Sequence, residues 1–139
     1  MTTVARFTLP DGTVFLSLGD LDEEQEAPLF SGNNAILHAS ELKCDIITVA
    51  HHGYNKVQAT YTAAKAQYAL WSNHTSDGFD KGFFGIGASW QYERAQDIIG
   101  WLKSANNNTN PETYYAGKNT VKLTCVNGTI TATLTDPVY

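Results

Sequence analysis

Two short segments of this sequence combine residue types that bind divalent metals. Residues 15–20 read FLSLGD, an apolar strand-like run that ends in Asp20. Residues 47–53 read ITVAHHG, a second apolar run that ends in His51 and His52. Carboxylate oxygens and neutral imidazole nitrogens are zinc ligands, and a carboxylate can give one oxygen to each of two ions. Because α/β sheets place their sites at strand ends, the two segments predict a metal site.

Each segment also has a simpler structural interpretation. Asp20 could be a turn residue or a helix N-cap, which Asp does well, and the sequence leaves both readings of Asp20 open. Adjacent histidines at a strand end are harder to explain by packing, and Gly53 lets a ligand approach the backbone closely. Metal binding is therefore favoured at His51 and His52, whereas His38 reads as an ordinary surface or hydrogen-bonded histidine.

The elements that must position these motifs alternate between strand and helix. Period-two runs and turn residues predict the strands, and helical periodicity with polar ends predicts the helices. This order is typical of an α/β domain, with a mixed sheet flanked by helices. The expected strands are 4–9, 13–18, 44–50, 68–71, 113–116, 121–126 and 129–134; the helices are 21–42, in two pieces, 57–66 and 90–105.

Length and composition restrict the class of protein. A chain of 139 residues with 42% hydrophobic and 17% charged residues predicts a single globular domain, residues 1–139. A net charge of -5 with nine basic residues argues against nucleic acid as a partner. We find no apolar run of about 20 residues and no signal-peptide pattern, so we expect no membrane contact and leave the cellular location open. Cys44 and Cys125 read as buried thiols, with a disulfide left open.

The two motifs in this order resemble the latter half of metallo-β-lactamase-fold hydrolases. The resemblance is to the branch that includes the hydrolase domain of competence proteins and the phosphorylcholine esterases. It implies the C-terminal part of an αβ/βα sandwich and two zinc ions in the full-length protein. By this resemblance Asp20 would bridge the ions and His51 would bind one of them. His52 would support a ligand or face the substrate, although which histidine ligates stays open.

The chain departs from that family in its other ligands. The family's H-x-H-x-D-H signature does not occur, and no histidine precedes Asp20. A catalytic zinc normally has three protein ligands and an open position. We therefore expect the missing N-terminal half of the same domain to supply the rest, with zinc binding weak or absent in this chain. Half a sandwich would also expose an apolar face and strand edges, which predicts self-association.

Asn73 and His74 follow the strand at 68–71 and open a loop rich in glycine and aromatic residues. Their place after a strand suggests substrate binding, with His74 contacting a phosphate or acting as an acid. A solvated loop histidine explains His74 equally well.

Two functions from different classes follow. The first is part of a metal-dependent hydrolase, inactive alone, whose full-length form cleaves a small-molecule ester or phosphoester. The second is a non-catalytic binding or interaction module with a degenerate hydrolase fold. The fold resemblance alone does not select the substrate.

Overall fold

The computed structural model describes residues 3–24, 38–72, 89–115 and 120–135. Its main sheet has five strands in the order β1-β2-β3-β4-β5. Strand β1 pairs antiparallel with β2, whereas β2 to β5 run parallel to one another. The carboxyl ends of β2, β3 and β4 therefore meet at one edge of the sheet. The strands are β1 (Ala5–Thr8), β2 (Val14–Ser17), β3 (Ile46–Thr48), β4 (Tyr68–Trp71) and β5 (Glu112–Tyr115).

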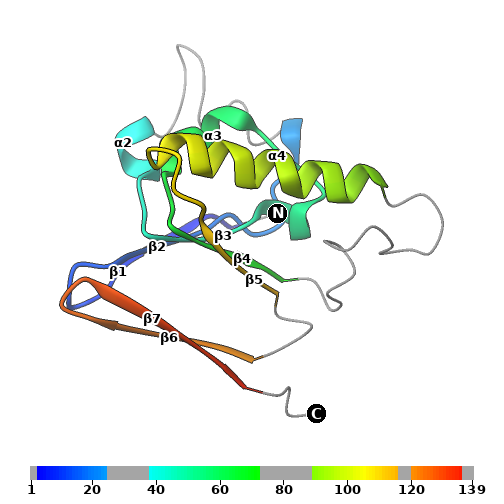
Figure 1. Cartoon of the computed structure of the whole chain (residues 1–139). Helices are drawn as coiled ribbons and strands as arrows, with labels where there is room; N and C mark the ends of the chain where they lie inside the picture. The colour runs from blue at the N-terminus through cyan, green and yellow to red at the C-terminus, as the bar shows by residue number, and fades with distance from the viewer. Residues whose placement is uncertain (1–2, 25–37, 73–88, 116–119, 136–139) are drawn as a thin grey trace.

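Helices cover one face of this sheet (Figure 1). They are α2 (Ala39–Leu42), α3 (Gln58–Ala64) and α4 (Ser89–Ala105), with the short turn η1 (Ala50–Gly53) at the end of β3. The core lies between the two layers. Leu16, Ile47 and Ala69 occupy one row across β2, β3 and β4. They are buried in one cluster with Ile98 and Leu102 of α4, so the central strands are fixed by apolar packing against the helices.

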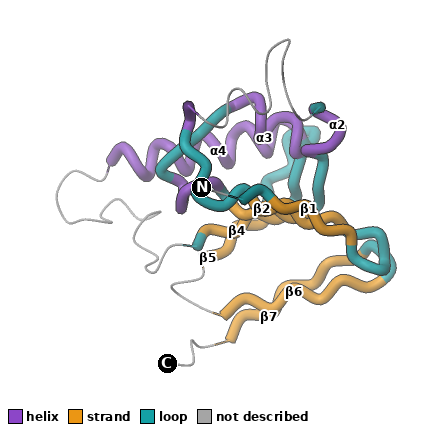
Figure 2. The backbone as a smooth tube through the Cα atoms, turned by 180° about the vertical axis from the view of Figure 1, so that it is seen from behind, coloured by secondary structure: helices purple, strands orange, loops and turns teal. Residues whose placement is uncertain are grey.

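A two-stranded hairpin lies on the other face of the sheet (Figures 1 and 2). It consists of β6 (Thr120–Val126) and β7 (Thr129–Thr135). Asn127 and Gly128 join them with positive φ of 51° and 74°, as a two-residue hairpin turn of the I′ type requires. The Tyr68 hydroxyl donates a hydrogen bond to the Ile130 carbonyl at 3.0 Å, which ties the hairpin to the main sheet.

The α/β class with a mixed sheet and helices is as predicted. Each predicted strand overlaps an observed one, and the helices predicted at 57–66 and 90–105 are α3 and α4. The prediction for 21–42 can be followed only at its ends, because 25–37 lie outside the described residues. Both cysteines are free thiols. Cys44 is buried, and burial raises the pKa of its thiol to about 12; Cys125 is half-buried.

Helix α4 offers a matched pair of substitutions that tests the packing of the core. Ile98 is fully buried, so Ile98→Ala should lower the free energy of unfolding by about 2–5 kcal/mol. An added Cβ at Gly100 meets no atom within 4 Å, so Gly100→Ala should raise it by about 1 kcal/mol through helix propensity. Denaturant unfolding measures both, and equal effects of the two substitutions would contradict this placement of α4.

Candidate functional site

The ends of three parallel strands bring polar side chains to one edge of the sheet. Asp20 follows β2, His51 and His52 follow β3, and Ser72 directly follows β4. The His51 amide donates a hydrogen bond to the Gly19 carbonyl at 2.8 Å, so the first two strand ends are in direct contact. The two motifs predicted from the sequence therefore lie next to each other.

The histidines lie in a left-handed turn, a conformation that side chains with a Cβ rarely adopt. His51 has φ 46° and ψ 50°, His52 has φ 57° and ψ 16°, and Gly53 has φ 86°. A left-handed residue other than glycine costs roughly 1–2 kcal/mol. Such strain persists only where the surroundings impose it, and it is concentrated at functional sites. The turn is closed by a hydrogen bond from the Tyr54 amide to the His51 carbonyl at 2.8 Å.

Gly53 lets the turn pack against the core. A Cβ added at Gly53 would lie 2.8 Å from Trp71 Nε1, closer than real Cβ atoms approach. The Trp71 ring is fully buried at the end of β4 and cannot move aside cheaply. The glycine of the His-His-Gly motif is thus required by its backbone conformation and by its contact with Trp71.

His52 is oriented by the end of β4. Its Nδ1 lies 3.1 Å from the Ser72 carbonyl oxygen and 2.9 Å from Ser72 Oγ. A carbonyl oxygen only accepts, so a proton on Nδ1 satisfies this contact. With the proton on Nε2, Nδ1 would instead accept from the Ser72 hydroxyl; with the proton on Nδ1, a neutral ring carries its lone pair on Nε2. Histidine ligands of metals have this arrangement, with the second ring nitrogen donating to a carbonyl or carboxylate.

His52 Nε2 faces Asp20, with 3.6 Å between Nε2 and Asp20 Oδ1. This distance is too long for a hydrogen bond. Two ligand atoms bound to one zinc at about 2.0–2.2 Å and a near-tetrahedral angle lie about 3.3–3.6 Å apart. The nitrogen and oxygen donors and their separation therefore fit two positions around a zinc ion. Both side chains are open to solvent, at 65% for Asp20 and 39% for His52, so as an ion pair alone they would contribute little stability.

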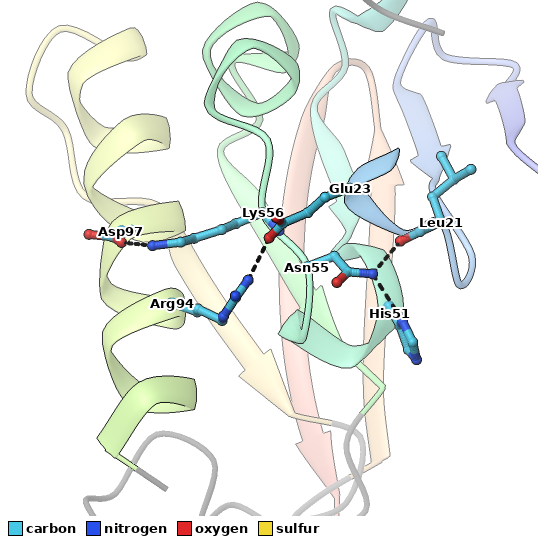
Figure 3. A network of polar contacts seen from close by, with 7 residues as sticks. All are labelled: Leu21, Glu23, His51, Asn55, Lys56, Arg94 and Asp97. Atoms are coloured by element: carbon cyan, nitrogen blue, oxygen red, sulfur yellow. Dashed lines mark hydrogen bonds and ion pairs between the residues drawn. The ribbon is translucent and has the colours of Figure 1, made fainter. Parts of the chain in front are cut away.

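His51 has the opposite environment. Its Nδ1 lies 3.0 Å from Nδ2, the side-chain amide nitrogen of Asn55. This nitrogen also donates a hydrogen bond to the Leu21 carbonyl at 2.9 Å (Figure 3). The resemblance implied His51 as the ligand, with the choice between the two histidines left open; in the structure His52 Nε2 is the ring nitrogen that faces Asp20, at 3.6 Å.

A group of charged side chains lies on the α4 side of Asn55 (Figure 3). Glu23 accepts hydrogen bonds from Arg94 at 2.6 Å and from the Lys56 amide at 3.3 Å. The Lys56 ammonium pairs with Asp97 of α4. The hydrogen bond from Arg94 is the largest effect and holds the pKa of the Glu23 carboxyl below its ordinary value. Burial opposes it, and the hydrogen bond from the Lys56 amide adds a smaller lowering. These pairs join both strand-end loops to α4.

The structure brings together Asp20, His51 and His52, whereas Asn73 and His74 lie outside the described residues. Sequence reasoning missed Ser72 and Asn55. Ser72 could have been found because, like Asp20, it follows a predicted strand. Nothing in the sequence signalled Asn55. Within residues 3–24, 38–72, 89–115 and 120–135, no group of three or more His, Cys, Asp or Glu side chains could hold a metal ion.

A pocket of about 610 Å³ lies at the opposite edge of the sheet, beside the amino ends of β3, β4 and β5. Its lining includes Lys43 and Lys65 together with Asp45 and Glu112. Charges of both signs select no ligand class, and none of these residues belongs to the strand-end cluster.

No family model, curated protein or solved structure shows a significant match to this chain. In the described part of the chain, no helix is both long enough and apolar enough to cross a membrane.

Gly53→Ala should destabilise the protein more than Gly12→Ala. Both glycines have φ near +90°, so both substitutions carry a similar backbone cost of about 1–2 kcal/mol. Only Gly53 adds the contact with Trp71, whereas Gly12 meets nothing within 4 Å. Overpacking against Trp71 should therefore add about 1–3 kcal/mol to the loss of unfolding free energy in Gly53→Ala, measured by denaturant unfolding. Equal losses of stability in Gly53→Ala and Gly12→Ala would mean that the turn does not pack against Trp71.

Glu23 should make stability depend on pH in the acid range. Its folded-state pKa is lowered, so its contribution is fully present above the ordinary pKa of glutamate, about 4.3, and is lost as the pH falls through the folded value. Because Glu23 is largely solvent-exposed, Glu23→Gln should lower the free energy of unfolding at pH 7 by at most about 1 kcal/mol. The difference from wild type should shrink as the pH falls through the folded-state pKa of Glu23.

The neighbouring Glu24 is the control for this measurement. Glu24 is exposed, and no described residue forms an ion pair with it. Glu24→Gln should change stability by less than Glu23→Gln at pH 7. A Glu23→Gln effect that does not change as the pH is lowered from 7 would contradict the linkage.

Proposed function

We propose that this chain contributes two ligands, Asp20 and His52, to the metal centre of a hydrolase. The observation that carries the proposal is the 3.6 Å approach of His52 Nε2 to Asp20 Oδ1, with His52 Nδ1 against the Ser72 carbonyl. A lone pair on Nε2 beside a carboxylate leaves two acceptors facing each other, which is unfavourable unless a cation or a proton lies between them. The strained turn that presents the histidine supports a functional role.

The fold we propose is the C-terminal part of a metallo-β-lactamase-type αβ/βα sandwich. Helices lie on one face of the main sheet and a second sheet, the β6–β7 hairpin, lies on the other, which is compatible with half of that architecture (Figure 2). The exposed apolar side chains of Phe7, Val126 and Leu134 would suit contact with further protein.

In the proposed reaction a small-molecule phosphoester or related ester is hydrolysed. A dinuclear zinc site would supply a water whose pKa is lowered to about 7. Asp20 would hold metal through its carboxylate. His52 would bind through Nε2, and the Ser72 carbonyl would keep the Nδ1 proton in place and increase the basicity of the ring. His51 would remain beside them as a donor to the substrate.

Two ligands do not complete a catalytic zinc, so the other ligands would come from outside the described residues. The partner we propose is the N-terminal half of the same domain, with its H-x-H-x-D-H segment. Alone, the chain would bind zinc weakly and associate with itself.

The second candidate is a binding or interaction module with a degenerate hydrolase fold. The observation that favours it is the lack, among the residues described, of any cluster of three metal-binding side chains. The two candidates differ in whether Asp20 and His52 bind zinc at all.

Zinc titration followed by the ring ¹⁵N resonances of the histidines separates the candidates. We expect weak binding that perturbs His52 Nε2, and an affinity at least about tenfold lower in Asp20→Ala and His52→Ala. His38→Ala is the matched control, because His38 is exposed at the start of α2, and it should bind like wild type. Equal zinc affinity in wild type, Asp20→Ala and His52→Ala would refute the proposal and favour the binding module.

A further inference from the structure

Asn55 connects the two strand-end loops through one amide nitrogen. It lies just after the left-handed turn, half-buried, and its Nδ2 is 2.9 Å from the Leu21 carbonyl oxygen and 3.0 Å from His51 Nδ1. Figure 3 shows the side chain between the two partners. An amide nitrogen carries two hydrogens and no lone pair for accepting, so it can serve both partners at once as a donor.

These contacts bear on which nitrogen of a neutral His51 ring carries the proton. The Leu21 carbonyl can only accept, which fixes the Asn55 atom beside it as the nitrogen rather than the oxygen. The second hydrogen of that nitrogen then points to His51 Nδ1, which must accept. A neutral ring that accepts at Nδ1 carries its proton on Nε2. His51 is thus an N–H donor, whereas His52, with its Nδ1 proton on the Ser72 carbonyl as proposed above, would present a lone pair.

We propose that Asn55 is a positioning residue that fixes His51 as the Nε2–H donor, and that this donor receives an anionic oxygen of the substrate. The proposal rests on the proposed function, because the ligand is the ester or phosphoester group placed beside Asp20 and His52.

The surroundings of His51 support a donor role. Within the described ranges its Nε2 has no hydrogen-bond partner, and the ring is only half-buried, so the proton is available to a ligand. The His51 and His52 ring centroids are 6.0 Å apart, a span that one small oxyanion can bridge. The Asp20 carboxylate would repel a substrate anion at this edge, and a fixed N–H donor offsets part of that repulsion.

The first test reads the His51 tautomer directly and needs neither metal nor substrate. Ring ¹⁵N spectra of the whole chain are recorded near pH 8.5, where imidazole is neutral. We expect His51 with Nδ1 unprotonated and Nε2 protonated, and His52 with the reverse. Asn55→Asp replaces the donor with an acceptor and should move the His51 proton to Nδ1. Asn55→Ala removes the donor and should leave His51 as a mixture of both tautomers.

Asn110→Asp is the matched control, since Asn110 is exposed in the loop before β5 and the substitution makes the same charge change away from the site. It should leave the His51 spectrum unchanged. Amide spectra of each variant establish that the chain is folded. A proton on His51 Nδ1 in wild type, or a tautomer that is unchanged in both Asn55 variants, would overturn the role of Asn55.

The second test uses inorganic phosphate as the probe. Phosphate should shift the His51 Nε2 resonance in wild type and in Asn110→Asp, and Asn55→Asp should need at least about tenfold more phosphate for the same shift. A His51 Nε2 resonance that does not shift when phosphate is added would overturn the donor role. Failure of the hydrolase proposal would look different from failure of the donor role. Zinc binding would then be independent of Asp20 and His52, while the His51 tautomer would be as expected.

Discussion

The whole site depends on the left-handed turn at the end of β3. Without it, the chain leaving β3 would not present two consecutive imidazoles at one edge of the sheet. The turn is strained at His51 and His52, and it is held in place by contacts with three separate segments. The His51 amide bonds to Gly19, the Ala50 amide is 3.2 Å from the Tyr61 hydroxyl, and Gly53 packs on Trp71. These contacts with the folded core therefore offset the free-energy cost of the strained backbone.

The bonds that orient the two imidazoles are neutral, whereas those that fasten the loops to α4 are ionic. Asn55, the Leu21 carbonyl and the Ser72 carbonyl act at short range and are little affected by salt. The pairs of Glu23 with Arg94 and of Lys56 with Asp97 are partly exposed and are screened by salt. The orientation of the two rings is thus set by contacts that ionic strength hardly changes, and the charged pairs contribute mainly to stability.

The sequence predicted the strands and the strand-end motifs because both are local signals. Apolar runs mark β2 and β3, and parallel pairing then brings Asp20 and the histidines to one edge. It could not predict which histidine faces Asp20, because this depends on the sign of φ at two consecutive residues and on partners 4 and 20 positions away along the chain. Asn55 was missed for the same reason: its role comes from a carbonyl on another loop, and no spacing rule encodes that contact.

Two adjacent histidines look equivalent in a sequence, but the fold makes them chemically opposite. A side chain that binds a metal must offer a lone pair, and a side chain that donates to an oxyanion must offer a proton. One tautomer of neutral imidazole cannot do both at Nε2. In the proposed site the Ser72 carbonyl accepts the Nδ1 proton of His52, and the Asn55 amide, anchored on the Leu21 carbonyl, leaves the proton of His51 on Nε2. Exchanging the two proposed roles would require changing both anchors, so the hydrogen-bond partners of His51 and His52 favour the assignment that we propose.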